Sequence, residues 1–277
     1  MSSVSPTLQN QVPTKSIKAR PSGFVADLLT IAGRAVRSIP REAEVFLPAL
    51  FIPAFFFIVN VGALQDLTER EVGGEIPFNY REFQLPTAII FAVTGISRAP
   101  SLVTDITTGY FDRLLLTPTK RLPLLLGLMV SDFLLVLGLC VPVLILGFAF
   151  GVSFGTGPLG LLLFILMGGL WGLAFTGFPY AIALKTGNAA AVASSFLLFF
   201  PFAFLTSSTV PFEELTGWLR AVARFNPLTY ILDGMRSLMG DSWDFAALGK
   251  ALGCILIVGI ISQTMSLLSL RGRIKQK

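Results

Sequence analysis

The sequence predicts an all-α integral membrane protein with six transmembrane helices and both termini in the cytoplasm. Three observations support this prediction. Hydrophobic residues make up 53% of the 277-residue chain and charged residues only 13%, whereas soluble domains carry about 25% charged residues. Six apolar stretches are each long enough to cross a hydrocarbon core, which needs about 20 helical residues. Lys and Arg gather on alternate connections between these stretches, as the positive-inside rule describes.

The N-terminal region is expected to lie in and on the cytoplasmic side of the membrane. Residues 1–22 are rich in Ser, Thr, Pro and Gln, which favours a disordered tail. Residues 24–38 have apolar side chains at helical spacing but too much charge to span, which predicts an interfacial helix. A plain juxtamembrane linker is the alternative. We expect one transmembrane domain over 23–270 and a basic cytoplasmic tail over 271–277.

The predicted spans alternate between a basic and an acidic side. Fourteen Lys and Arg residues lie on the termini and connections of one side and five on those of the other. Ten of the 16 acidic residues lie in the loops 64–84 and 210–247. Both termini are therefore predicted to be cytoplasmic, in a multi-pass protein of the cell membrane. The predicted spans cover residues 45–63, 85–103, 124–150, 159–184, 190–209 and 248–268.

The chain has no motif for catalysis or metal binding. It contains no His, and Cys140 and Cys254 lie in apolar runs without CxxC spacing. A GxxxxGK[ST] phosphate loop is also absent. We therefore expect no catalytic residue, no metal site and no cofactor bound to this chain itself. The net charge of +5 comes from residues at the span ends, so topology explains it better than a nucleic-acid partner.

The most polar connection on the predicted inner face reads GYFDRLLLTPTKR (109–121). It combines an aromatic pair, an adjacent ion pair, a run of leucines and a helix-ending Thr-Pro. A short amphipathic helix at a membrane surface suits docking into a groove on another protein. The alternative is an ordinary interfacial loop whose leucines lie among lipid headgroups.

The longest outer connection, 210–247, is too apolar for a simple loop. After Pro211, apolar residues recur at three- to four-residue spacing as far as Phe225, which predicts a helix. The sequence RFNPLTYILDGMR (224–236) then predicts a second short helix. Asp233 and Arg236 have i, i+3 spacing and can pair, which would allow both to lie near lipid depth.

The two motifs, in this order, resemble the membrane-spanning subunits of ABC-2 type exporters, which include daunorubicin-resistance permeases. The likeness covers about residues 20 to 270. It implies that the inner loop contacts a separate ATPase and that re-entrant helices between spans five and six cap the exit path. A purely structural lid is the alternative for the outer helices. The residues implied in ATPase coupling are Gly109, Tyr110, Phe111, Asp112, Arg113, Leu114, Leu115 and Pro118. Those of the outer motif are Asn226, Pro227, Tyr230, Asp233 and Arg236.

Two further ionisable residues, Arg98 and Asp132, fall in or near predicted spans. Charge in hydrocarbon costs about 2.5–3.5 kcal/mol on insertion scales, so each needs a partner, water or a route to the interface. An Arg98–Asp132 pair inside the bundle is one hypothesis, and a structural or interfacial role is favoured over a proton relay.

The resemblance implies a permease subunit of an ATP-driven exporter, with ATP and Mg bound by the partner ATPase. A second permease copy or a paralogue and membrane lipids are the other expected partners. The aromatic stretch 196–204 of the predicted fifth span favours a hydrophobic or amphiphilic cargo such as a drug, lipid or polyketide-like molecule. The alternatives are a polysaccharide or teichoic-acid exporter, an ion-coupled transporter, and a scaffold that anchors an ATPase without transport.

Overall fold

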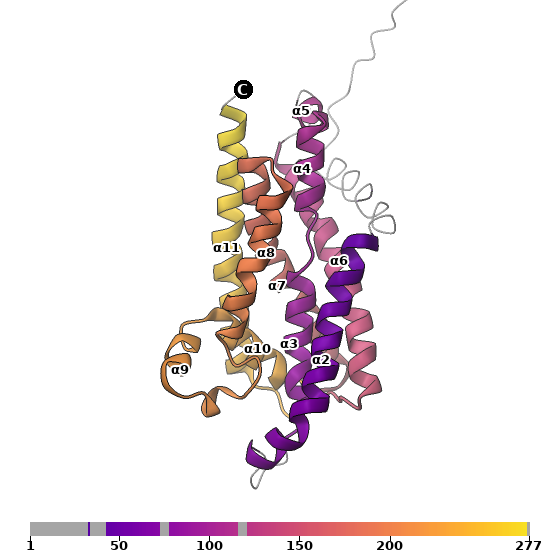
Figure 1. The fold of residues 1–277 in the computed structure, drawn as a ribbon, viewed down its shortest axis with the longest axis vertical. Helices are drawn as coiled ribbons and strands as arrows, with labels where there is room; N and C mark the ends of the chain where they lie inside the picture. The colour runs from indigo at the N-terminus through magenta and orange to yellow at the C-terminus, as the bar shows by residue number, and fades with distance from the viewer. Residues whose placement is uncertain (1–32, 34–42, 73–77, 116–120, 276–277) are drawn as a thin grey trace, which may run out of the picture.

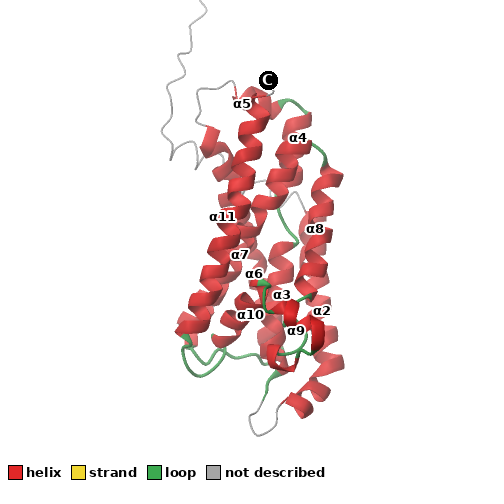
Figure 2. Cartoon of the chain, turned by 90° about the vertical axis from the view of Figure 1, so that its left-hand side faces the viewer, coloured by secondary structure: helices red, strands yellow, loops and turns green. Residues whose placement is uncertain are grey.

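The computed structural model describes residue 33 and residues 43–72, 78–115 and 121–275. Within these ranges the regular structure is entirely helical, and Figure 2 shows helices joined by short loops. The prediction of an all-α protein is therefore confirmed for the described residues. The tail predicted over 1–22 and the interfacial helix predicted over 24–38 lie outside them, apart from the single residue 33.

The long helices run side by side in an elongated bundle (Figure 1). They are α2 (Ala43–Val72), α3 (Tyr80–Thr94), α6 (Arg121–Ala149), α7 (Gly157–Thr186), α8 (Ala189–Phe204) and α11 (Phe245–Lys275), and the shorter α4 (Ala99–Thr107) follows α3. The short α5 (Tyr110–Leu115) lies at the same end as the C-terminus, here named the α5 end. The opposite end, here named the α10 end, holds the 3-10 helix η2 (Phe212–Glu214), α9 (Gly217–Ala223) and α10 (Pro227–Ser237).

Five helical segments of the described residues are long and apolar enough to cross a membrane. They are Leu47–Asp66, Tyr80–Thr107, Leu126–Ala149, Gly157–Thr186 and Phe245–Ile274. The helix at the predicted fifth span, α8, has 16 residues and ends at Phe204, whereas the sequence predicted a span to residue 209. The protein is thus a multi-pass helical membrane protein by length and composition. The count of six spans stays a prediction.

The predicted second span is one segment made of two helices. It begins at Tyr80, where the Asn79 side chain accepts hydrogen bonds from the first backbone N–H groups of α3. Residues 95–98 then interrupt the helix before α4 begins. Pro100 lies in the first turn of α4, where its missing N–H has no helical partner to lose. The span predicted over 85–103 thus lies within the segment Tyr80–Thr107 and contains this interruption, and we name residues 95–98 the α3/α4 break.

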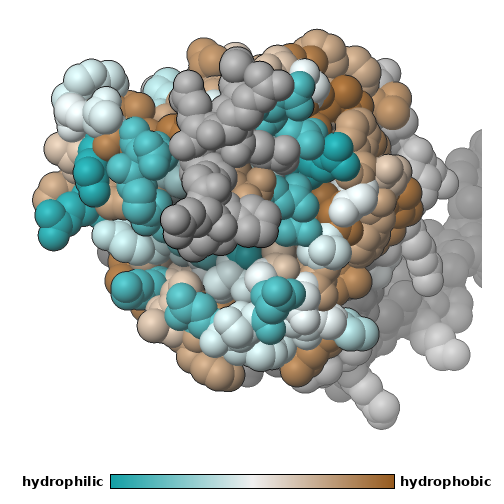
Figure 3. Space-filling model, turned by 90° about the horizontal axis from the view of Figure 1, so that it is seen from below, coloured by the Kyte–Doolittle hydropathy of each residue, from teal (hydrophilic) through white to brown (hydrophobic). Residues whose placement is uncertain are grey.

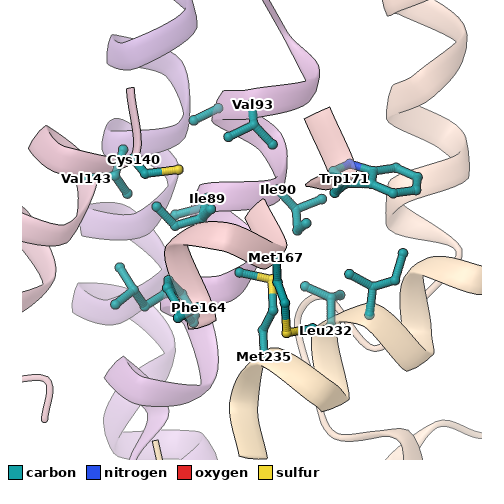
Figure 4. Close-up of a cluster of buried hydrophobic side chains, with 14 of the residues drawn as sticks. Ile89, Ile90, Val93, Cys140, Val143, Phe164, Met167, Trp171, Leu232 and Met235 are labelled. Atoms are coloured by element: carbon teal, nitrogen blue, oxygen red, sulfur yellow. The ribbon is translucent and has the colours of Figure 1, made fainter. Parts of the chain in front are cut away.

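The centre of the bundle is α7, which packs against α3, α4, α6, α8 and α11. Its glycines allow this close contact. A Cβ at Gly177 would lie 2.5 Å from the Ser262 carbonyl carbon of α11, so only glycine fits this crossing. Figure 4 shows the adjoining core, where side chains of α3, α6, α7 and α10 meet around Met167 and Trp171. The core thus joins the spans to the short helix α10.

Two expected boundaries also differ from the structure. The helix expected after Pro211 is split, because α9 starts only at Gly217, whose positive φ of 58° suits glycine. The basic tail expected from residue 271 is instead helical to Lys275. The Arg273 guanidinium donates to the Leu184 carbonyl oxygen at 3.0 Å, which ties this last stretch of α11 to α7.

Candidate functional site

The predicted coupling segment forms a compact turn and helix beyond the end of α4. Gly109 connects α4 and α5 with a φ of 72°, a left-handed conformation that glycine adopts at little cost. The Arg113 N–H donates to the Gly109 carbonyl oxygen at 3.2 Å, which closes the first turn of α5. Helix α5 packs against α4, so α4 and α5 form one continuous arm at this end.

The side chains of α5 divide between the core and the surface. Phe111 is 1% exposed and packs in a cluster of residues from α4, α6, α7, α8 and α11. Tyr110 is 38% exposed, and Arg113 is also exposed. Phe111, one of the residues implied in ATPase coupling, is therefore not available as a surface contact, because its ring packs α5 against the bundle. The side chains of Asp112, Leu114 and Leu115, and the whole of Pro118, lie outside the described residues.

Asp132 of α6 lies at the α3/α4 break, where its carboxylate caps the start of α4. The Arg98 backbone N–H donates to Asp132 Oδ1 at 3.0 Å, and the Ser97 hydroxyl donates to Oδ2 at 3.4 Å. The Ala99 N–H donates to Ser97 Oγ at 3.1 Å. A carboxylate at the N-terminus of a helix satisfies N–H groups that have no helical acceptor, and it complements the helix dipole.

The predicted partners Arg98 and Asp132 are thus joined through the Arg98 backbone N–H. Both residues are buried, with 5% and 1% of their surface exposed. The charge of Arg98 and the Tyr180 hydroxyl of α7 also act on the Asp132 carboxylate. Helices α4, α6 and α7 therefore meet at one buried polar cluster, which we name the Asp132 cluster.

At the α10 end, the polar residues of the NPLTY sequence (226–230) close three helix ends. The Asn226 amide donates to the carbonyl oxygens of Phe202 at 2.7 Å and Leu205 at 3.1 Å, at the end of α8. Its Oδ1 accepts from the Leu228 N–H at 3.0 Å, which caps α10. Pro227 occupies the first turn of α10, where proline is favoured.

The same sequence also holds the end of α9. The Thr229 hydroxyl donates to the Ala223 carbonyl oxygen at 2.8 Å, and the Tyr230 hydroxyl donates to that of Arg224 at 2.7 Å. Carbonyls at a helix C-terminus have no helical donor of their own. The motif residues thus replace missing helical bonds, which accounts for their spacing without any ligand.

Arg236 joins α10 to α3 and to the segment after α8. It donates to the Phe83 carbonyl oxygen at 3.0 Å and to the Ser207 carbonyl oxygen at 2.7 Å. Its guanidinium carbon lies 3.5 Å from the centroid of the Phe83 ring. A salt bridge of 3.3 Å joins it to Asp233, which confirms the predicted i, i+3 pair. The planar fork of arginine allows these several contacts at once.

Burial governs the electrostatics of this pair. Desolvation raises the pKa of the Asp233 carboxyl above its ordinary value, and the Arg236 charge opposes that shift. Desolvation also lowers the pKa of Arg236 to about 10, with Asp233 opposing. Arg236 stays charged at neutral pH and can therefore act as a permanent tie between α10 and α3.

The sequence did not predict several side chains that interact with Asp132 and Arg236. Ser97, Tyr180 and Ser207 are ordinary polar residues in or beside apolar runs, and no spacing marks them. The GISRAP sequence (95–100) was a usable signal, because Gly and Pro bracket a Ser-Arg pair inside an apolar run. The interruption comes just before Pro100, at residues 95–98.

The known family that matches the chain is a membrane transporter family. Its model, described as "ABC-2 type transporter", matches residues 26–239. The chain belongs to the ABC-2 type transporter family. This ABC-2 chain is 26% identical over 211 residues to the daunorubicin resistance ABC transporter permease protein DrrB1 of Streptomyces coeruleorubidus, covering 75% of this chain and 71% of that protein. It is 24% identical over 231 residues to the putative transport permease ycf38 of Cyanophora paradoxa, covering 81% and 78%.

These findings establish the class of the protein. An ABC-2 chain with several apolar helices is a transmembrane transport permease. The family also implies partnership with an ABC ATPase subunit. The matched range includes α5, the Asp132 cluster and α10, so the three regions described above all lie in the family's own domain.

Proposed function

We propose that this chain is the membrane-spanning subunit of an ATP-driven exporter for a hydrophobic or amphiphilic compound. A separate ATPase binds ATP and Mg, and two permease subunits, identical or paralogous, form the pathway. The chain crosses the cell membrane six times, with α8 as the fifth span and the α5 end in the cytoplasm. The observation that carries this proposal is the position of α5 at one end of an ABC-2 bundle, with Tyr110 and Arg113 exposed.

The α4–α5 arm supports a coupling role for this end. Phe111 fixes α5 to the helices that meet at the α5 end. A force applied to α5 by an ATPase therefore reaches α4 and the Asp132 cluster. Gly109, Asp112, Leu114, Leu115 and Pro118 complete the proposed docking segment, with Tyr110 and Arg113 as its exposed contacts.

The α10 end supports a second part of the proposal, in which re-entrant helices enter the outer leaflet. Trp218 and Phe225 of α9 and its following turn are 71% and 87% exposed. Figure 3, which views the molecule from this end, shows hydrophilic and hydrophobic surface side by side, with hydrophobic surface gathered toward the upper right. Exposed aromatic side chains such as these suit the membrane interface. The NPLTY residues and the Arg236–Asp233 pair then hold the cap over the exit path.

Charge reversal on α5 tests the ATPase contact. The Arg113→Glu variant reverses the charge that α5 presents to the ATPase. It should leave the core intact, because the Arg113 side chain is exposed. We expect the ATPase recovered with the tagged permease from its native membrane to fall by about tenfold, the effect of losing about 1.4 kcal/mol at an interface. The matched control is Lys185→Glu, an exposed residue in the last turn of α7 at the same end.

The outcomes separate the assignment from its rivals. Full ATPase recovery with Arg113→Glu and with an added Tyr110→Ala change would remove α5 as the coupling element. Recovery of the unmodified permease without any ATPase, together with cargo flux driven by an imposed proton gradient, would favour the ion-coupled alternative.

A further inference from the structure

An apolar groove lies on the side of the bundle where α6 and α11 both pack against α7, and we name it the α6/α11 groove. Its volume is about 300 Å³, at the low end for ligand pockets. Gln263 is the one polar residue among those that line it. The Gln263 amide donates to the Leu173 carbonyl oxygen at 2.8 Å, so this polar group is bonded to α7. The groove is thus narrow and almost wholly apolar.

The groove lies in the half of the bundle nearer the α5 end. Its α6 wall begins at Leu126, in the second turn of that helix, and reaches Phe133, about 10 Å farther along. One leaflet of the hydrocarbon core is about 15 Å thick. The groove therefore follows much of the depth of one leaflet, which is the inner leaflet when the α5 end is cytoplasmic.

A basic side chain, Arg271, continues the α11 wall of the groove toward the membrane surface. Gln263, Leu267 and Arg271 recur every four residues and so lie along one face of α11. Arg271 is about 39 Å along the helix from Phe245, beyond the roughly 30 Å of a hydrocarbon core. It is exposed, and no acceptor for its guanidinium lies within the part of the chain that the structure describes. Arg273, by contrast, is bonded to α7.

An apolar groove with a cation at its surface end has the chemistry of a phospholipid site. An acyl chain is slender and apolar and runs along the depth of a leaflet, while its headgroup places a phosphate at the surface. Guanidinium groups bind phosphate through paired N–H donors. The anionic inner leaflet also attracts Lys and Arg side chains near its surface. A water-soluble partner would reach Arg271 but not the apolar lining.

We propose that the α6/α11 groove binds one anionic phospholipid, with its acyl chain against Val130 and Leu267 and its phosphate on Arg271. The assignment to the inner leaflet rests on the topology in the proposed function. The lipid has a supporting role, because Met129 lines the groove and also belongs to the buried cluster that holds Phe111. An occupied groove therefore supports the packing that fixes α5 to the bundle.

Two lipids with the same acyl chains test the charge requirement. Dioleoyl phosphatidylglycerol has a net negative charge, whereas dioleoyl phosphatidylcholine is zwitterionic. The delipidated full-length permease in nonionic detergent is titrated with each lipid, and bound lipids are counted by native mass spectrometry. We expect phosphatidylglycerol to bind about fivefold more tightly, the effect of one basic residue near an anionic lipid. Equal affinities of the wild type for the two lipids would overturn the proposal.

Changes at Arg271 locate the headgroup. Arg271→Ala should make the two affinities equal, whereas Arg271→Lys should keep most of the preference because the charge remains. The matched control is Lys185→Ala, an exposed basic residue at the same end in the last turn of α7. A loss of preference in Lys185→Ala as large as in Arg271→Ala would assign it to the overall charge of the α5 end and overturn the proposal.

A filling substitution locates the acyl chain. Val130 is half-buried and lines the groove, so the ring of Val130→Phe should occupy it and weaken the binding of both lipids by about tenfold. The matched control is Val141→Phe, at a 50% exposed position of the same helix outside the groove. Leu267→Phe, on the α11 wall, is the second variant if Val130→Phe does not fold.

The remaining outcomes also decide the proposal. Unchanged lipid affinity in both Val130→Phe and Leu267→Phe would place the acyl chain elsewhere and overturn it. ATP-dependent transfer of the bound lipid across a vesicle bilayer would make the groove a cargo path, which overturns the supporting role. Since the binding assay uses neither ATP nor the ATPase, its failure leaves the proposed export function to be decided by the Arg113→Glu experiment.

Discussion

The α10 end and the α3/α4 break both interrupt helices, but they satisfy the freed backbone groups in different ways. At the α10 end, Asn226, Tyr230 and Arg236 donate to carbonyl oxygens of separate elements. At the break, the single carboxylate of Asp132 accepts both the Arg98 N–H and the Ser97 hydroxyl. At the α10 end the side chains reach carbonyl oxygens of several elements, whereas at the break the contacts centre on Asp132, with Ser97 accepting from the Ala99 N–H.

The largest expected effect comes from removing Arg236. Arg236→Ala deletes the donors to the Phe83 and Ser207 carbonyls and leaves Asp233 without its cation. Loss of one partner of a buried pair costs about 3–5 kcal/mol. We expect about 3 kcal/mol here, at the lower end, because the Asp233 side chain is 43% exposed. The measurement is the thermal unfolding midpoint of the purified permease in detergent.

Two variants sharpen this test. Arg224→Ala, an exposed arginine at the same end, should leave the midpoint unchanged. Arg236→Lys should recover only part of the loss, because lysine lacks the planar fork that reaches several acceptors and stacks on Phe83. If Arg236→Ala unfolded at the wild-type temperature, the α10 end would not be held by this residue.

The contrast also shows what sequence patterns can and cannot predict. Helix type, the approximate ends of the long helices and the Asp233–Arg236 pair follow from hydrophobic runs and from i, i+3 spacing, which are local properties. The Arg236 contacts with Phe83 join residues 153 positions apart. Nothing local marks such a contact, because it depends on how α10 packs across α3.

The α5 end illustrates the same limit for single residues. Tyr110 and Phe111 were both implied in ATPase coupling, but adjacent residues of the six-residue helix α5 point to different faces. The packing of α5 against the bundle buries the Phe111 ring and leaves Tyr110 partly exposed. Likewise, Asp132 was recognised as a costly charge, whereas its role as the cap of α4 required the position of α6 beside the break.

The Asp132→Asn change should lower stability less than Arg236→Ala does, and its main effect should be on transport. The Asp132→Asn change keeps an oxygen that accepts from the Arg98 N–H but removes the charge that complements the start of α4. We expect a loss of about 1 kcal/mol, the range of one hydrogen bond. ATPase recovery should stay normal while cargo flux per ATP hydrolysed falls in reconstituted vesicles. Normal flux would show that the break does not transmit the motion of the α4–α5 arm.

The smallest effect on stability should come from the charge of the Asp233 carboxyl. Its pH dependence shows whether desolvation or the Arg236 salt bridge dominates the energetics of this residue. Burial raises the pKa of Asp233 from its ordinary value of 3.8 despite the Arg236 charge. A carboxyl with a raised pKa in the folded state binds protons more tightly there than in the unfolded chain, so its contribution to stability grows as the pH falls toward the ordinary value. Asp233→Asn cannot titrate. The wild type should therefore gain stability relative to Asp233→Asn between neutral pH and about pH 4. A relative loss of stability over that window would mean that the Arg236 pair outweighs desolvation and that the carboxylate itself holds α10.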